Sequence, residues 1–240
     1  MKTTRFNAVF PPGIIVSCQA QPGEPLYKPE GGIMCLMALA AQQAGAIGIR
    51  ANKAQDVRQI KAMVTLPVIA IDKTHYPDSD IYVTPTMAEV DRLMAVEGVE
   101  ALAIDYTLRP RPHGESLDML TAAIRAKYPH VAIMADIITF EEGLNAWKLG
   151  VDAVATTLYG TKGIPETDGP KPNIRVASRL AHAVDVPVIA EGGIYREEHV
   201  TALFEGGVYA VVIGGAITRP KEITERYVAA YQATQKEHTP

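Results

Sequence analysis

Short apolar runs alternate with longer amphipathic segments along most of the 240-residue chain. Eight runs have strand length and lack a polar alternation, which is typical of strands buried on both faces. These predicted strands cover 13–17, 46–50, 67–71, 101–105, 131–135, 153–157, 187–190 and 210–213. Most of the intervening segments carry apolar residues at i, i+3 and i+4, as Leu117, Leu120 and Ile124 do, and this spacing predicts helices. The predicted helices cover 33–44, 54–63, 87–96, 116–127, 140–149, 174–183, 197–204 and 221–232.

Eight strand–helix units in a chain of this length predict a closed α/β barrel, the single-domain (β/α)8 TIM barrel, over residues 1–240. Glycines at the predicted helix ends, including Gly45, Gly98 and Gly150, fit this division. Residues 66–73 resemble residues 186–193, half the chain away, as expected for a barrel of two related halves. The polar residues after about 234 are predicted to form a frayed tail.

Composition narrows the functional class. The chain is 48% hydrophobic with a net charge of −4 and has no lysine- or arginine-rich block, so neither nucleic acid nor an anionic membrane is an expected partner. No apolar stretch approaches the roughly 20 residues of a membrane span, and the first residues do not resemble a signal peptide. We therefore expect a cytoplasmic protein, in which Cys18 and Cys35 are reduced, buried thiols. Neither these cysteines nor the six histidines have metal-ligand spacing, so no metal site is predicted.

Candidate chemistry lies at the carboxyl ends of the strands, where TIM barrels place their active sites. Polar residues stand at or just beyond seven of the eight predicted strand ends. They are Ser17 and Gln19, Arg50, Asp72 and Lys73, Asp105, Asp136, Thr156 and Thr157, and Glu191.

Lys73 is the most specific of these candidates. A lysine desolvated in a closed site has a lowered pKa and serves as a general base or a Schiff-base nucleophile near neutral pH. The alternative is a surface lysine paired with Asp72 or Asp78, and position alone does not decide between the two.

Three other charged residues have both a chemical and a structural interpretation. Glu191 and Asp136 are candidates for a proton donor or for a clamp on sugar hydroxyls, although either can merely bind loop amides. Arg50 suits an oxygen that gains negative charge during a reaction, but a structural ion pair with Asp136 is the alternative.

Two glycine pairs end the seventh and eighth predicted strands, Gly192-Gly193 and Gly214-Gly215. Glycine lets the backbone approach an anion closely, and N–H groups at a helix start attract negative charge. Arg219 stands where the last helix begins and is positioned to complete a phosphate clamp. The pairs therefore favour a phosphate-binding site over simple close packing.

Two polar segments follow strands at the expected active-site end. Residues 73–80 are long enough to fold over the barrel mouth, and we expect His75 within them to be a loop contact rather than the base. Residues 159–172 are rich in Gly, Thr and Pro and are predicted to form a second mobile loop.

Several motifs together resemble one enzyme family over almost the whole chain, the bacterial N-acetylmannosamine-6-phosphate 2-epimerases of sialic-acid degradation. They lie at 13–20, 48–52, 76–86, 134–139, 141–143, 155–158, 190–192 and 214–220. The resemblance implies a cofactor-independent isomerase that interconverts N-acetylmannosamine 6-phosphate and N-acetylglucosamine 6-phosphate. It also implies a homodimer.

The resemblance also implies roles for individual residues. Lys73 falls on the catalytic lysine and Glu191 on its acidic partner, while Arg219 falls on the phosphate-binding arginine. The sugar-binding positions fall on Gln19, Arg50 and Asp136. At the end of the sixth strand, we add Thr157 and Tyr159 to the expected substrate-binding residues.

The chain departs from many members of that family near the expected phosphate site. Relatives often read Lys-Arg-Asp at 73–75, Glu-Gly-Arg at 191–193 and Gly-Ser at 214–215, where this chain has Thr74, His75, Gly193 and Gly215. These differences affect the expected phosphate contacts and leave the Lys73 and Glu191 pair in place.

Epimerisation at C2 requires removal of a proton beside the C1 aldehyde and its return on the opposite face. Two-base and one-base versions both fit the sequence, with Glu191 or Lys73 returning the proton. Two other functions remain open: a phosphate-binding barrel enzyme that uses Lys73 to form a Schiff base, and a non-catalytic sugar-phosphate sensor.

Overall fold

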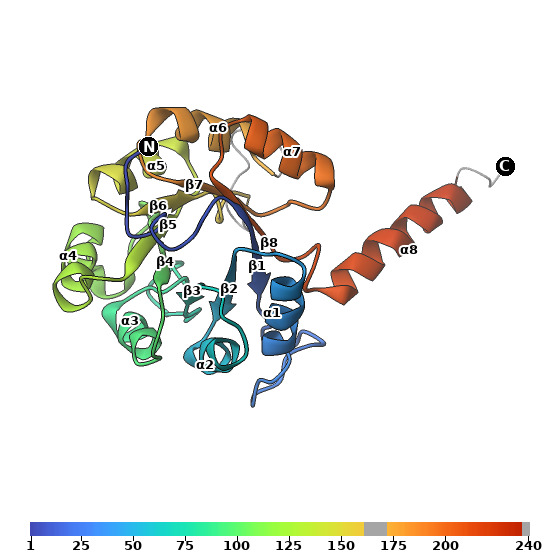
Figure 1. Cartoon of the computed structure of the whole chain (residues 1–240), viewed down its shortest axis with the longest axis horizontal. Helices are drawn as coiled ribbons and strands as arrows, with labels where there is room; N and C mark the ends of the chain where they lie inside the picture. Colours follow the sequence, from blue (N-terminus) through green and yellow to red (C-terminus); the bar gives the residue numbers. More distant parts are fainter. Residues whose placement is uncertain (161–171, 237–240) are drawn as a thin grey trace.

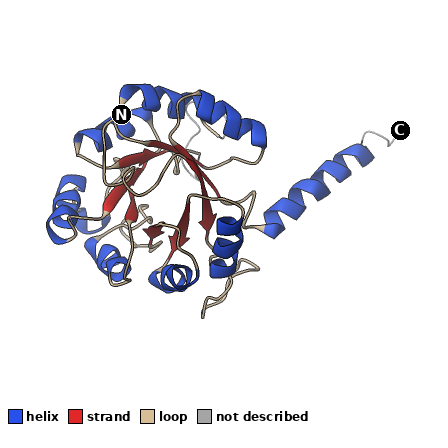
Figure 2. Ribbon diagram, viewed as in Figure 1, coloured by secondary structure: helices blue, strands red, loops and turns tan. Residues whose placement is uncertain are grey.

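The computed structural model describes residues 1–160 and 172–236. Its eight parallel strands pair in chain order, and β8 pairs with β1 to close a barrel. Figure 2 shows the ring of strands with helices around it. The strands are β1 (Gly13–Cys18), β2 (Gly48–Asn52), β3 (Val68–Ile71), β4 (Ala101–Asp105), β5 (Ala132–Asp136), β6 (Ala153–Ala155), β7 (Val188–Glu191) and β8 (Ala210–Ile213).

Each strand is followed by a helix, which confirms the predicted (β/α)8 TIM barrel. The helices are α1 (Met34–Gln43), α2 (Ala54–Met63), α3 (Met87–Met94), α4 (Leu117–Lys127), α5 (Phe140–Lys148), α6 (Ile174–Ala183), α7 (Glu197–Glu205) and α8 (Pro220–Lys236). A short 3-10 turn, Pro112–Gly114, precedes α4.

Local sequence signals explain several helix ends. Thr86 and Thr139 open α3 and α5 with capping boxes, in which each threonine hydroxyl accepts a backbone N–H and a glutamate three residues later binds back. Gly45 and Gly150, just beyond α1 and α5, have φ of +90° and +79°, a left-handed conformation that favours glycine.

One boundary error matters for the site. The second strand was predicted at 46–50, but β2 runs from Gly48 to Asn52. The prediction ended the strand at Arg50 because a charged residue usually marks the end of an apolar run. In the barrel, Arg50 is instead buried within the strand beside carboxylates. Arg50 consequently lies in mid-strand, and Asn52 occupies the end of β2.

Alternate strand residues point into the barrel. Small and branched residues such as Ile15, Ile69, Ala103 and Ala132 form one buried cluster, separate from the larger cluster between strands and helices. The same alternation carries polar side chains to the interior at the carboxyl ends of the strands. They are Ser17, Arg50, Asn52, Lys73, Asp105, Asp136, Thr157 and Glu191.

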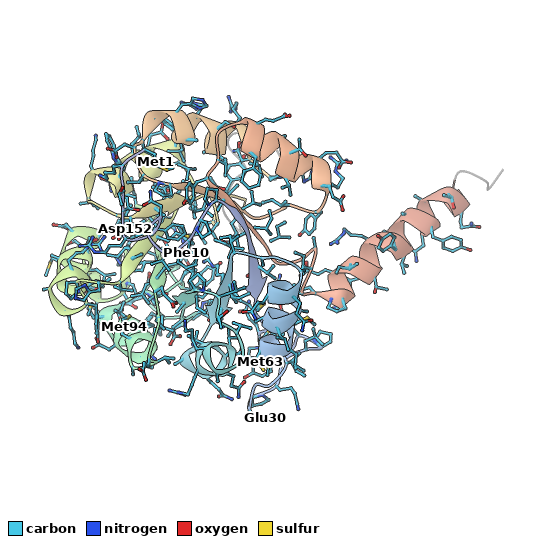
Figure 3. All side chains as sticks on the ribbon, viewed as in Figure 1. Met1, Phe10, Glu30, Met63, Met94 and Asp152 are labelled. Atoms are coloured by element: carbon cyan, nitrogen blue, oxygen red, sulfur yellow. The ribbon has the colours of Figure 1, made fainter. Side chains whose placement is uncertain are left out.

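The first residues of the chain plug the barrel at its other end. Phe6 and Phe10 are fully buried, stack at 4.6 Å between ring centroids and pack against the interior cluster. Figure 3 labels Phe10 among the side chains within the ring. Gly48 is required there, because a Cβ would lie 2.8 Å from the Phe10 ring.

The predicted cover at 73–80 belongs to a hairpin-like connection between β3 and α3. Lys73 pairs antiparallel with Val83, and the N–H of Thr74 donates to the Tyr82 carbonyl at 3.0 Å. His75 stacks on Tyr82 at 5.4 Å, so it is a loop contact, as expected.

Helix α8 differs from the other helices because it projects away from the barrel (Figures 1 and 2). It runs to Lys236, beyond the predicted end at 232, so residues 234–236 of the predicted tail are helical. The rest of that tail, 237–240, and residues 161–171 of the predicted second loop lie outside the described residues.

Candidate active site

The strand ends of β1, β3, β7 and β8 surround a pocket of about 210 Å³. Its lining includes eight of the predicted site residues, from four separate parts of the chain. They are Gln19, Lys73, Glu191, Gly192, Gly193, Gly214, Gly215 and, at the start of α8, Arg219. The alternation of the strands and the glycine turns after β7 and β8 explain why these residues meet.

Lys73 stands directly beyond β3 and lines this pocket. Burial lowers its pKa to about 8, and the nearby cations Arg50 and Arg219 act in the same direction. The ion pairs considered as the alternative are not formed, because Asp72 binds Lys53 and Arg92 while Asp78 accepts from the His113 backbone. In the described part of the chain, the Lys73 ammonium has no hydrogen-bond or ion-pair partner.

Glu191 joins the pocket to a buried charged layer beneath it. The Arg50 guanidinium donates to Glu191 Oε2 at 2.5 Å and binds both oxygens of Asp136, at 3.1 and 2.5 Å. The Thr157 hydroxyl donates to Asp136 at 2.7 Å. The ion pair between Arg50 and Asp136 is therefore real, as the structural alternative predicted.

Burial and these neighbours set the charge states. Burial raises the pKa of Glu191, and Asp136 raises it further, whereas Arg50 opposes both. Burial disfavours the charged form of Arg50, but the two carboxylates outweigh burial and hold its pKa above the usual value. The layer therefore contains a fixed cation next to a carboxyl group that protonates more readily than usual.

Two buried polar atoms near the pocket have no protein partner among the described residues. They are Oε1 of Gln19, whose Nε2 donates to the Ser17 hydroxyl at 2.8 Å, and Nε of Arg50. A buried acceptor without a partner costs free energy unless a ligand or water satisfies it. Gln19 lines the pocket, so it is positioned to accept an N–H or O–H from a bound ligand.

The glycine turns after β7 and β8 form another part of the pocket wall. Gly192 and Gly193 have φ of +97° and +71°, so both need glycine. A Cβ on Gly215 would lie 2.5 Å from a carboxylate oxygen of Glu222 and 3.2 Å from the Tyr195 ring. In this chain those two side chains occupy the space that a serine at 215 would need.

Arg219 lines the pocket, and its guanidinium also interacts with two carboxylates. It donates to Glu222 at 2.9 Å and lies 3.6 Å from Glu24. Its side chain is about one third exposed, so the guanidinium is accessible to an anion.

Four predicted substrate-binding residues do not line the pocket. Arg50, Asp136 and Thr157 form the layer behind Glu191 and reach the pocket through it. Tyr159 is 3% exposed and packs in the interior cluster.

Two residues near the site, Asn52 and Tyr195, were given no role in the sequence analysis. Asn52 binds the backbone of Lys73, and the two-residue spacing from Arg50 along β2 would have placed both side chains on the interior face. Tyr195 lines the pocket from the turn after β7, and Arg226 stacks on its ring at 4.5 Å. No pattern in the sequence marks Tyr195.

Residues 1–160 and 172–236 lack two further features. No group of three or more His, Cys, Asp or Glu side chains is arranged to hold a metal ion. None of the helices there has both the length and the apolar character that crossing a membrane requires.

Comparison with known proteins gives one consistent result. A family model described as "Putative N-acetylmannosamine-6-phosphate epimerase" matches residues 34–233. A relative from Enterobacter sp. (strain 638) is 47% identical over 92% of this chain and 93% of its own length. One from Caldanaerobacter subterraneus subsp. tengcongensis is 48% identical over 90% of each chain. Both carry the name "Putative N-acetylmannosamine-6-phosphate 2-epimerase".

Comparison with solved structures supports the same family. The N-acetylmannosamine-6-phosphate 2-epimerase from Clostridium perfringens superposes with a TM-score of 0.85 at 43% identity and covers 93% of this chain and 95% of its own. A thiamine phosphate pyrophosphorylase from Pyrococcus furiosus matches at 16% identity with a TM-score of 0.57, which shows a shared fold alone. The chain belongs to the N-acetylmannosamine-6-phosphate epimerase family.

Proposed function

We propose that the protein is an isomerase that interconverts N-acetylmannosamine 6-phosphate and N-acetylglucosamine 6-phosphate by moving a proton at C2. Family membership supports the substrate. The observation that carries the chemistry is a lysine of lowered pKa that lines one pocket with a carboxyl group of raised pKa. That combination suits proton removal and return.

In the proposed reaction, neutral Lys73 takes the C2 proton of the open-chain sugar. The electrons of the C2–H bond form a C1–C2 double bond, and the C1 carbonyl becomes an enolate oxygen. The cations Lys73, once protonated, and Arg50, behind Glu191, stabilise this negative charge. Glu191 then donates its proton to the opposite face of C2, and the enolate electrons re-form the C1 carbonyl in the same step. The lysine proton afterwards returns to the Glu191 carboxylate through water.

Substrate binding divides between two parts of the pocket. We assign the phosphate to Arg219 and the backbone at Gly192, Gly193, Gly214 and Gly215. Gln19 is assigned to the sugar, because its side-chain oxygen is an unpartnered acceptor at the pocket wall. Arg50, Asp136 and Thr157 then act through Glu191, which they hold in place.

The proposal is tested by following N-acetylmannosamine 6-phosphate with the purified protein by NMR, in the presence and absence of borohydride. The proposal predicts formation of N-acetylglucosamine 6-phosphate, with no covalent adduct at Lys73 after reduction. A trapped adduct would instead support the Schiff-base enzyme, and binding of the sugar phosphate without turnover would support the sensor.

We also propose that the protein is a homodimer, on the evidence of α8. Ile14 on β1 and Ile213 on β8 remain partly exposed, where a barrel helix would normally cover them. The helix itself exposes Tyr227, Val228 and Tyr231, at 75%, 46% and 66%. Large apolar surfaces of this kind are typical of protein interfaces, and a second copy supplies both complementary parts.

A cytoplasmic location completes the proposal. The two cysteines, Cys18 and Cys35, are free and buried, as expected in a reducing compartment.

A further inference from the structure

The ends of β2 and β3 are joined by a side chain where the backbone ladder stops. The N–H of Lys53 makes the last ladder bond, to the Ile71 carbonyl at 2.8 Å. At Lys53 the chain turns away with φ of +68°, a left-handed conformation that is uncommon for a residue with a Cβ. Two residues after the end of β3, the N–H of Lys73 also faces β2, and it donates to Oδ1 of Asn52 at 3.0 Å. The Asn52 amide therefore takes the place of the missing backbone carbonyl.

Asn52 is well placed to hold Lys73 rigidly. Its side chain is on the interior face of β2 and the residue is 5% exposed. The outer side of the same turn is held by Asp72, which binds the Lys53 ammonium and accepts from Arg92 at 3.0 Å. The lysine backbone is thus fixed on the pocket side by Asn52 and on the outer side through its neighbour Asp72.

This support matters because no group in the described residues holds the Lys73 ammonium directly, and the antiparallel pairing with Val83 holds only the backbone. A lysine side chain has four rotatable bonds, and this one has no hydrogen-bond or ion-pair partner at its tip. The direction in which the amine projects therefore depends on the backbone position at residue 73. An error of about 1 Å in the position of a catalytic group can lower a rate by about 100-fold.

We propose that Asn52 is a positioning residue, which sets the backbone of Lys73 so that its amine meets C2 of the substrate. The inference rests on the proposed function, in which Lys73 removes the proton. Asn52 itself contacts the lysine backbone and does not line the pocket.

Two variants test the proposal. Asn52→Ala removes the acceptor, and we expect kcat to fall about 10- to 100-fold while KM changes less than about threefold, because binding residues are untouched. Asn52→Asp keeps an oxygen acceptor for the Lys73 N–H and adds a negative charge. We expect this variant to recover much of the lost kcat at high pH. The added charge raises the pKa of Lys73, so the rising limb of kcat/KM moves to higher pH than in the wild type.

A matched control for Asn52 lies at the other end of β3. Gln42 also accepts a backbone N–H with its side-chain oxygen, from Thr65 at 2.8 Å, just before β3 begins. Gln42→Ala should leave kcat and the pH profile unchanged, even if its thermal unfolding midpoint falls as much as that of Asn52→Ala.

The inference and the proposed function fail in different ways. Wild-type kcat in Asn52→Ala, or an Asn52→Asp pH profile that coincides with the wild-type profile, would overturn the role of Asn52. If Asn52→Ala does not fold, the Asn52→Asp profile alone decides. Full activity in Lys73→Ala would overturn the proposed function instead.

Discussion

Lys73 shows how a single residue acquires its chemistry from its surroundings. An ordinary lysine with a pKa of 10.5 is neutral in roughly 0.03% of molecules at pH 7. Burial, together with Arg50 and Arg219, lowers the pKa of Lys73 to about 8, so roughly a tenth of molecules carry the neutral amine at that pH. In the proposed mechanism, this lowered pKa increases the fraction of Lys73 in the base form more than a hundredfold.

The lowered pKa predicts the pH dependence of the reaction. Because neutral Lys73 and protonated Glu191 are the active forms, kcat/KM should rise with pH towards the pKa of Lys73, about 8, and fall again as Glu191 loses its proton. The measurement is kcat/KM against pH in buffers of constant ionic strength. A plateau already reached at pH 6, or a rise centred near 10.5, would contradict the assignment of this lysine as the base.

Arg219 allows a prediction about binding. Replacing it with alanine removes a charged hydrogen-bond donor to phosphate, worth about 1.5–3 kcal/mol, so KM for N-acetylmannosamine 6-phosphate should rise about 10- to 100-fold with little change in kcat. Inhibition by inorganic phosphate should weaken in parallel.

The control for Arg219 is Lys221→Ala, which removes a neighbouring cation that does not line the pocket. This variant should leave KM and the inhibition by inorganic phosphate close to the wild-type values. An unchanged KM in Arg219→Ala would mean that the phosphate binds elsewhere.

At the level of elements, sequence periodicity located the strands and helices. It did not predict which contacts hold their ends. Continuous apolar runs identify buried strands whatever their partners, so β8 and α6 have the predicted bounds. The end of β2 was misplaced because the buried charge of Arg50 is compensated by Asp136, far away in the sequence. The role of Asn52 was missed for the same reason, since its partner is the backbone of a residue on another strand.

Helix α8 carries the prediction for association. We expect the protein to be a dimer in light scattering, and the double variant Tyr227→Ser, Tyr231→Ser to shift it towards a monomer, because both side chains are largely exposed on α8. Met119→Ser is the control, since it removes another largely exposed apolar side chain from α4, which lies across the barrel from α8 (Figure 1). A wild-type monomer at micromolar concentration would contradict the proposal.

At the level of the whole molecule, the barrel brings together residues that are up to 200 positions apart in the chain, because Gln19 and Arg219 line one pocket. The rule that barrel sites lie at the carboxyl ends of the strands was enough to find Lys73, Glu191 and the glycine turns. The rule did not distinguish the residues that line the pocket from those in the charged layer behind Glu191. That division depends on side-chain length and depth along each strand, and it places Arg50, Asp136 and Thr157 behind Glu191.

The plug at the amino-terminal end of the barrel is another whole-molecule feature without a sequence signal. Phe6 and Phe10 lie outside any regular element, and their burial depends on the space left by Gly48. Periodicity describes only helices and strands, so it assigns no structure to such a segment.

The most direct test of the account is exchange of the C2 hydrogen of N-acetylmannosamine 6-phosphate with D2O, followed by NMR. We expect rapid exchange with the wild-type protein and a loss of at least about 1,000-fold in Lys73→Ala, with unchanged thermal unfolding. Exchange at the wild-type rate in Lys73→Ala would contradict the central claim that Lys73 removes the proton.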